Sequence, residues 1–267
     1  MTHSQICEQC IKLFSILYNH IFKSSILEKN PFLVEKNHTL GRGNMRKGIP
    51  SIILSSADGR LEGKYKVGRG NNPPIAMVLH PHSGYGGTMD NPIVYNIFTA
   101  FANLGFSVLR INFRGVGKST GKFDNGQGEL ADAATALDWL QAKNPNTNEC
   151  WVAGFSFGSY ISMQLLMRRP EIKRFVAVAP QPNIYDFTFL APCPSSGLLV
   201  CPDDDPTVPR DSVNKLYEKL KSQKRIEVEM EKCKGANHFF TNKETELSNI
   251  VKNYIKTQVE SSDTSLG

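Results

Sequence analysis

Hydrophobic residues follow two alternating patterns along most of the chain. Short apolar runs bounded by turn residues predict β-strands, whereas apolar residues repeated every three or four positions predict helices. The predicted strands span residues 51–54, 61–67, 75–79, 106–113, 150–153, 175–179, 197–201 and 226–230. The predicted helices lie at residues 92–104, 130–140, 160–167, 213–220 and 247–255. This order predicts an α/β fold, with a mostly parallel, twisted sheet of about seven to eight strands and helices on both faces.

The sheet is expected to begin with an antiparallel hairpin, because the first two predicted strands flank the turn-forming pair Asp58-Gly59. The next strand, residues 75–79, is an unbroken apolar run of the kind that is buried on both faces of a parallel sheet. Functional groups in such sheets gather at the carboxyl ends of the strands. The loops that leave strands are therefore where candidate chemistry is expected.

We divide the chain into an N-terminal extension at residues 1–46, one α/β domain at residues 47–260 and a flexible tail at residues 261–267. The extension holds an amphipathic stretch around Phe14 and Phe22, followed by a linker that contains Lys, Asn and Gly. Because Met45 stands just before the first predicted strand, a start assigned too far upstream explains the extension. A helix that binds a partner or a membrane surface is the alternative.

Composition agrees with a folded globular domain, since 40% of the residues are hydrophobic and 21% are charged. The net charge of +6 comes from Lys and Arg residues scattered along the chain, which argues against a nucleic-acid partner. No segment reaches the roughly 20 consecutive apolar residues of a membrane span, and the cleavage signature of a secretory signal is missing. We therefore expect a cytoplasmic protein.

The six cysteines show no disulfide framework, and several lie in apolar stretches where free thiols are commonly buried. This usage indicates a reducing compartment. Cys7 and Cys10 form a C-x-x-C, but no second pair and no histidine cluster accompanies it. We therefore predict neither a metal site nor a redox site there.

The segment from Gly154 to Gly158 reads G-F-S-F-G and fits the G-x-S-x-G pattern of a nucleophile elbow. It follows an apolar strand and precedes a predicted helix, as that turn requires. The glycines two residues either side of Ser156 would let the strand and the helix approach closely. Ser156 is therefore the candidate nucleophile.

A serine hydroxyl needs a base to accept its proton and a carboxylate to orient that base. The loop after the strand at residues 226–230 carries His238, and the loop after the strand at residues 197–201 carries three adjacent aspartates, Asp203, Asp204 and Asp205. This chain order, serine then aspartate then histidine, matches the order expected for such a site. His238 is the candidate base, and the residues alone leave all three aspartates open.

From about Pro50 to Ile255 the chain resembles a small, lidless α/β-hydrolase, similar to the dienelactone-hydrolase-like and serine-peptidase-like branches. Asp205 holds the first position of the D-x-x-V-P pattern familiar from this fold, so the resemblance favours it as the third member. Residues 80–87 stand where the family's His-Gly oxyanion loop follows its third strand. A dienelactone hydrolase proper would have cysteine at position 156, so that particular activity is not implied.

The resemblance also implies an oxyanion hole built from the Phe157 N–H and a second N–H at the position of His82 or Ser83. Pro81 replaces the usual glycine, which leaves the choice between these two positions open. Residues 112–119 resemble the D-x-R-G-x-G-x-S turn, except that Asn112 replaces the usual aspartate.

Two other patterns suggest different chemistry. His80 and His82 are spaced like metal ligands at a strand end, but no further His or carboxylate cluster completes a zinc site. The glycines at residues 115, 117 and 121 imitate a dinucleotide-binding loop, but their spacing is one residue too long. We predict no metal and no cofactor.

Only a short segment, residues 181–196, separates two strands where many lipases insert a helical lid, so the site is expected to be open. Tyr85, Phe155 and Phe239 are expected to line an apolar acyl pocket, with core packing as the alternative. The predicted activity is hydrolysis of a small-molecule substrate, a short-chain carboxylester or thioester, through an acyl-enzyme. A peptidase-like hydrolase and a non-catalytic binding protein of the same fold are the alternatives. No pattern indicates an oligomeric state.

Overall fold

A computed structural model describes residues 49–264, with side chains described as far as residue 261. The predicted N-terminal extension at residues 1–46 and the Cys7–Cys10 pair lie outside the described residues. At the other end, the last helix continues to Thr264, four residues into the predicted tail. None of the described helices combines the length and the apolar character that a membrane crossing needs.

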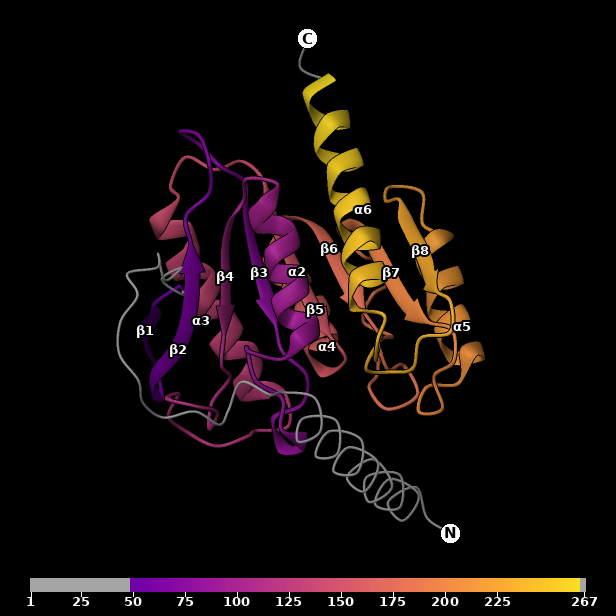
Figure 1. The fold of residues 1–267 in the computed structure, drawn as a ribbon, viewed down its shortest axis with the longest axis horizontal. Coiled ribbons are helices and arrows are strands. Elements are labelled where there is room, and N and C mark those ends of the chain that lie inside the picture. The colour runs from indigo at the N-terminus through magenta and orange to yellow at the C-terminus, as the bar shows by residue number, and fades with distance from the viewer. Residues whose placement is uncertain (1–48, 265–267) are drawn as a thin grey trace, which may run out of the picture. The chain divides into compact units, whose positions relative to one another are not determined.

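The described residues form an eight-stranded sheet with helices on both faces, which confirms the predicted α/β fold (Figure 1). The strands are β1 (Ser51–Ser56), β2 (Gly59–Lys66), β3 (Ile75–Leu79), β4 (Ser107–Ile111), β5 (Cys150–Phe155), β6 (Ile172–Val178), β7 (Ser196–Pro202) and β8 (Val228–Cys233). The helices are α2 (Pro92–Asn103), α3 (Gln127–Lys143), α4 (Phe157–Leu166), α5 (Arg210–Lys221) and α6 (Glu244–Thr264), with a short 3₁₀ turn η1 (Ser83–Tyr85).

The strand order across the sheet is β1-β2-β4-β3-β5-β6-β7-β8. The β1–β2 hairpin and the β2–β4 pair are antiparallel, and all remaining pairs are parallel. The loops after β3 to β8 in the parallel part therefore leave from one edge of the sheet. Every residue predicted for the site lies on one of these loops, at the end of β5 or at the start of α4.

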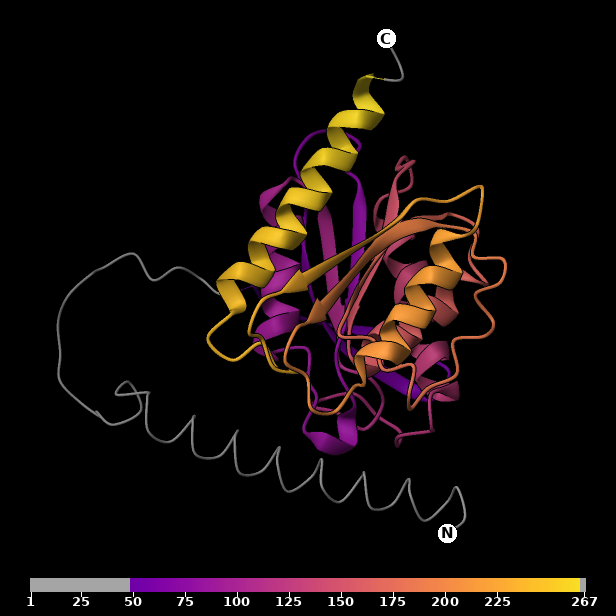
Figure 2. The same ribbon diagram turned by 90° about the vertical axis from the view of Figure 1, so that its right-hand side faces the viewer.

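Alternate residues of the central strands face two separate cores. On β3, Met77 joins the core beneath α3, α4 and α5, whereas Val78 joins the core beneath α2 and α6. Figures 1 and 2 show these two helix layers on opposite faces of the sheet. Burial on both faces explains why β3 reads as an unbroken apolar run.

Several predicted boundaries shift in the structure, among them those of β8 and α4. The last strand was expected at residues 226–230, but β8 spans Val228–Cys233, because it is an edge strand whose exposed Glu229 and Glu231 obscure its apolar pattern. The third predicted helix was expected from Tyr160, but α4 begins at Phe157, directly after Ser156. The second shift tightens the turn between β5 and α4.

Candidate active site

Ser156 occupies a sharp turn between β5 and α4. Its backbone has a φ of 55° and a ψ of −116°, a conformation that costs free energy for a residue other than glycine. The flanking glycines make the turn sterically possible, since a Cβ on Gly154 would overlap the Gly158 carbonyl and a Cβ on Gly158 would overlap the Leu79 carbonyl. The local sequence thus builds a turn that holds the Ser156 side chain at the end of the central strand.

The structure brings Ser156, His238 and Asp205 together from three separate loops. His238 Nε2 lies 3.2 Å from Ser156 Oγ, and His238 Nδ1 lies 2.7 Å from an oxygen of Asp205. Ser156 is 4% exposed and His238 is 2% exposed. The three side chains therefore lie in a row from the hydroxyl to the carboxylate, with little access for water.

A network of donors holds the Asp205 carboxylate in place. The carboxylate oxygen that does not face His238 accepts hydrogen bonds from the Thr207 N–H, the Thr207 hydroxyl and the Val208 N–H, at 2.8, 2.6 and 3.2 Å. Burial alone would raise the pKa of Asp205, but hydrogen bonds from His238 and Thr207 outweigh it, and the pKa lies below its usual value. Asp205 is thus an anion that can only accept.

The two neighbouring aspartates have other roles. The Asp203 N–H donates to the Cys233 carbonyl and the Asp204 N–H donates to the Ala236 carbonyl, at 3.1 and 2.9 Å. These bonds join the loop after β7 to the loop that carries His238. Of the three aspartates that the sequence left open, Asp205 is the one that contacts His238.

Ser156 has a second partner that the sequence analysis did not identify. Its hydroxyl donates to the side-chain oxygen of Gln181 at 2.9 Å, and Gln181 is 3% exposed. Gln181 follows β6 by three residues and so lies on the same edge of the sheet. A polar residue in a loop that leaves a strand was the signal available for it, but no motif marks it.

The two segments considered for an oxyanion hole meet beside Ser156. Phe157 is the first residue of α4, so its N–H has no acceptor within the helix. The His82 ring lies 5.3 Å from the Phe157 ring, between centroids, which brings the loop after β3 against the start of α4. His82 and Ser83 begin the tight turn η1, in which their carbonyls accept from the N–H groups of later residues.

The geometry of His80 and His82 does not suit a shared metal. His80 Nδ1 contacts the Pro81 carbonyl at 2.6 Å and its Nε2 accepts the Phe113 N–H at 3.0 Å, so both ring nitrogens are occupied. His82 Nδ1 accepts the Gly84 N–H at 3.0 Å. Burial lowers the pKa of each ring to about 4. Both histidines are therefore neutral groups that fix the loop after β3, and no metal-binding cluster occurs within the described residues.

The three aromatic residues expected to contact substrate occupy different environments. Phe155 is fully buried on β5 and packs 5.7 Å from the His238 ring, so the expectation that it lines an open pocket is not met. Its strand is central and is covered on both faces. Phe239 is half-buried and meets the His238 ring edge-on, and Tyr85 is half-buried 4.7 Å from the His82 ring. These two rings remain near the surface of the site.

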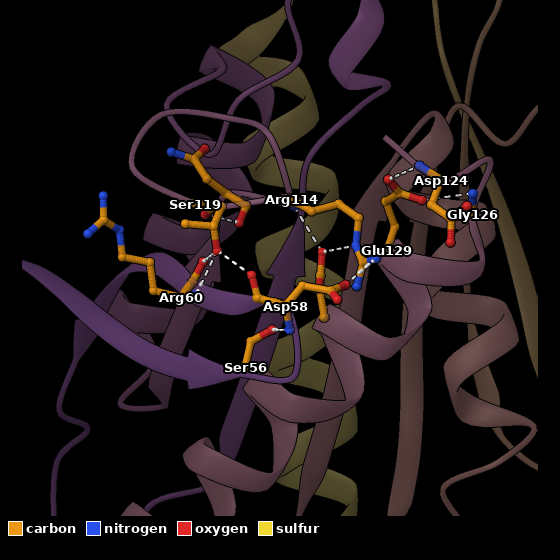
Figure 3. Close-up of polar contacts among 11 residues, drawn as sticks. Ser56, Asp58, Arg60, Arg114, Ser119, Asp124, Gly126 and Glu129 are labelled. Atoms are coloured by element: carbon orange, nitrogen blue, oxygen red, sulfur yellow. Dashed lines mark hydrogen bonds and ion pairs between the residues drawn. The ribbon is translucent and has the colours of Figure 1, made fainter. Parts of the chain in front are cut away.

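A second buried polar network lies at the ends of β2 and β4 (Figure 3). The Arg114 guanidinium makes two hydrogen bonds to Asp132, at 3.1 and 2.8 Å, and an ion pair with Asp58 at 2.6 Å. The Asn112 amide donates to the Glu62 carboxylate at 3.0 Å and accepts the Met89 N–H at 2.8 Å. This pairing explains why asparagine replaces the aspartate of the common turn pattern, because an aspartate here would face another carboxylate.

Comparisons with known proteins agree with this architecture. A sequence model of the family described as "alpha/beta hydrolase fold" matches residues 77–197. An uncharacterized protein from Rickettsia prowazekii is 48% identical over 213 residues, which cover 78% of this chain and 90% of the relative. A crystal structure of an Agrobacterium tumefaciens protein of unknown function, described as an alpha/beta hydrolase, shares 52% identity at a TM-score of 0.78 and covers 79% of this chain and 97% of its own.

A third similar protein, from Xanthomonas campestris, is described as an α/β serine hydrolase without a lid. Its crystal structure shares 30% identity at a TM-score of 0.72 and covers 78% of this chain and 94% of its own. In this chain, too, only an irregular segment joins β6 to β7, with no helix between the two strands.

Proposed function

Because this chain belongs to the α/β-hydrolase family, we propose that it is a serine hydrolase in which Ser156, His238 and Asp205 form the catalytic triad. One observation carries the proposal. A strained turn presents the Ser156 hydroxyl 3.2 Å from a histidine nitrogen whose opposite side is anchored 2.7 Å from a buried carboxylate. This is the arrangement that converts a weak alcohol into a nucleophile.

The proposed reaction proceeds through an acyl-enzyme. Ser156 Oγ attacks a carbonyl carbon while its proton passes to His238 Nε2, and the imidazolium returns that proton to the leaving group. Asp205 keeps the ring oriented and stabilises its charge. A water molecule then attacks the acyl group by the same route, which releases the acid and restores the Ser156 hydroxyl.

The negative charge that develops on the carbonyl oxygen needs fixed donors. The N–H of Phe157 is the proposed first donor, since it stands at the positive end of α4 directly after Ser156. The N–H of His82 or Ser83 is the proposed second donor, from the loop held against α4 by the ring contact of His82 with Phe157.

The proposed substrates are small carboxylesters or thioesters. The loops around Ser156 contain no inserted helix, which favours substrates that reach the site without moving a cover. The half-buried rings of Tyr85 and Phe239, which contact His82 and His238, offer apolar contact, and the Ser156 hydroxyl contacts the side chains of Gln181 and His238. Such surroundings favour a neutral acyl group of modest size.

Labelling with a fluorophosphonate tests the chemistry, because this probe reacts only with activated serines. Wild-type protein is expected to take up one probe at Ser156, located by peptide mass, and Ser156→Ala is expected to take up none. Ser162→Ala is the matched control, since Ser162 is a buried serine on α4 that bonds to the Ser159 carbonyl. A folded wild-type protein that stays unlabelled favours a non-catalytic binding protein. A panel of short esters, thioesters and peptides then separates esterase from peptidase activity.

A further inference from the structure

Gln181 and His238 compete for the single proton of Ser156. The side-chain oxygen of Gln181 lies 2.9 Å from Ser156 Oγ, and His238 Nε2 lies 3.2 Å from the same atom. A hydroxyl has one proton to donate. The hydrogen bond that Ser156 makes to Gln181 therefore occurs at the expense of the bond to His238.

The competition depends on which ring nitrogen of His238 carries a proton. Asp205 is ionised and can only accept, so His238 Nδ1 at 2.7 Å from it carries a proton. In the neutral imidazole the other nitrogen, Nε2, carries the lone pair and is an acceptor. Both neighbours of the Ser156 hydroxyl are thus acceptors, and the shorter contact is the one to Gln181.

The chain holds Gln181 firmly in this position. Prolines flank it on both sides, and its backbone carbonyl accepts the N–H groups of Ile184 and Tyr185, each at 3.0 Å. Two residues later, the Asn183 amide donates to the Thr207 carbonyl at 3.0 Å. Thr207 also bonds Asp205, so one set of contacts fixes Gln181 relative to the carboxylate side of the site.

We propose that Gln181 is a positioning residue that holds the Ser156 proton away from His238 in the free protein. Activation then requires the hydroxyl to rotate, which breaks the O–H···O bond to Gln181 and forms an O–H···N bond to His238. Only after this exchange can the proton pass to Nε2 as Oγ bonds to the carbonyl carbon. The inference rests on the proposed function, because it concerns how that nucleophile is activated.

Two variants of similar length test this role. Gln181→Met removes the competing acceptor, and Gln181→Glu replaces it with a stronger, charged acceptor. Since a hydrogen bond contributes about 0.5–1.5 kcal/mol net, we expect the Met variant to react with a fluorophosphonate about 2- to 10-fold faster than wild type. The Glu variant is expected to react more slowly than wild type, with the largest deficit at alkaline pH, where its carboxylate is ionised.

Gln141→Met is the matched control, because Gln141 is a half-buried glutamine on α3 that bonds Arg169 and Glu171 away from the site. It should leave the labelling rate unchanged. Thermal unfolding of each variant shows whether it folds. A Met variant that reacts at the wild-type rate, or more slowly, overturns the proposal, as does a Glu variant that reacts faster.

A measurement that needs no turnover separates this inference from the proposed function. The ¹⁵N chemical shift of His238 Nε2 reports whether that nitrogen accepts a hydrogen bond, and His238→Gln assigns the signal. We expect the shift to lie closer to the hydrogen-bonded value in Gln181→Met than in wild type. One outcome is that neither wild type nor the Gln181 variants react with the fluorophosphonate, while the ¹⁵N shift still changes as expected. In that case the proposed function fails and the role of Gln181 stands. An unchanged shift overturns the role of Gln181.

Discussion

Two buried polar networks lie along the same sheet and differ in how completely their groups are paired. Around Arg114, the guanidinium and the Asp132 carboxylate are joined by charged hydrogen bonds, and Glu62 accepts from the Asn112 amide and the Lys118 N–H. Around Ser156, one proton is shared between two acceptors and the backbone is strained. We call the first network saturated, because its charged groups face opposite charges or hydrogen-bond donors, and the second unsaturated, because one hydroxyl proton faces two acceptors.

The difference in pairing predicts that one network contributes to stability and the other to the reaction. A saturated network resists change, because moving any member leaves a buried group without its partner. An unsaturated one has a low-cost alternative arrangement, and a proton can move within it. The Arg114 network joins the β1–β2 hairpin to α3 through Asp58 and Asp132 (Figure 3). We expect substitutions there to change stability, and substitutions around Ser156 to change reaction rate.

Ser156→Ala is expected to have the largest effect. Hydrolysis of a short-chain ester should fall about a thousandfold or more, because the attacking atom is removed while the oxyanion donors remain. The free energy of unfolding in urea should change by less than about 1 kcal/mol, because Ala keeps the same Cβ on the strained turn. Ser162→Ala should retain full turnover. A large stability loss in Ser156→Ala with residual turnover would contradict the division between the two networks.

Asp132→Asn tests the saturated network. Asp132 is 1% exposed, and its loss as an anion leaves the Arg114 charge with an ion pair to the half-exposed Asp58 and a weaker interaction with Glu129. We expect the free energy of unfolding to fall by about 3–5 kcal/mol, as for other broken buried ion pairs. The double substitution Arg114→Met with Asp132→Leu should cost less than Asp132→Asn alone. Fluorophosphonate labelling of the folded fraction should keep its rate, and a folded variant that labels as poorly as Ser156→Ala would break the comparison.

The pH dependence of stability comes partly from His80. In the unfolded chain this ring takes up a proton below its ordinary pKa of 6.5, whereas complete burial lowers the folded pKa to about 4. The unfolded state therefore binds more protons between these values, so stability is lost as the pH falls from 6.5 to 4. The linkage amounts to about 3 kcal/mol, with no further loss from this group below pH 4.

Urea unfolding at a series of pH values measures this contribution. In His80→Gln the slope of unfolding free energy against pH should be smaller between pH 4 and 6.5. His82 gives a residual slope of the same sign, since burial lowers its pKa as well. An unchanged slope in His80→Gln would show that the ring nitrogens bound to Phe113 and Pro81 do not exclude protons.

Asn112→Asp is expected to have the smallest effect of the four. It places a carboxylate about where the Asn112 amide now lies 3.0 Å from Glu62, so we expect a loss of about 1–3 kcal/mol at pH 7. The repulsion raises the pKa of one carboxyl, so the deficit relative to wild type should shrink as the pH falls toward 5. Adding Glu62→Gln restores a carboxylate–amide pair and should recover most of the stability. A deficit that grows at low pH would contradict this account.

Much of the fold was predictable because its signals are local. Strands β1, β2, β3, β4, β5 and β7 begin within two residues of their predicted starts, since each is an apolar run bounded by turn residues. The predicted end of the edge strand β8 lay three residues before its observed end at Cys233, because exposed charged residues interrupt its apolar pattern. The sequence did not show that β4 lies between β2 and β3, because that order depends on contacts between distant segments.

The residues of the candidate site also fall into those that local sequence identifies and those that only tertiary contacts place. Ser156 was identifiable because the glycines that its turn requires are two residues away in the chain. Gln181 was missed because nothing near it in sequence differs from an ordinary loop, and only the return of β6 beside β5 brings it to the hydroxyl. Phe155 was expected near substrate, but a central strand buries both of its faces, and the sequence does not mark which strand is central.

The sequence by itself determined the elements, the sharp turn at Ser156 and the order in which serine, aspartate and histidine follow the strands. Tertiary structure decided which of three aspartates meets His238, which second acceptor shares the Ser156 proton and why asparagine stands opposite Glu62. The reason is one of range. Steric rules act between neighbours along the chain, whereas a hydrogen bond depends on distances of a few tenths of an ångström between segments that only folding brings together.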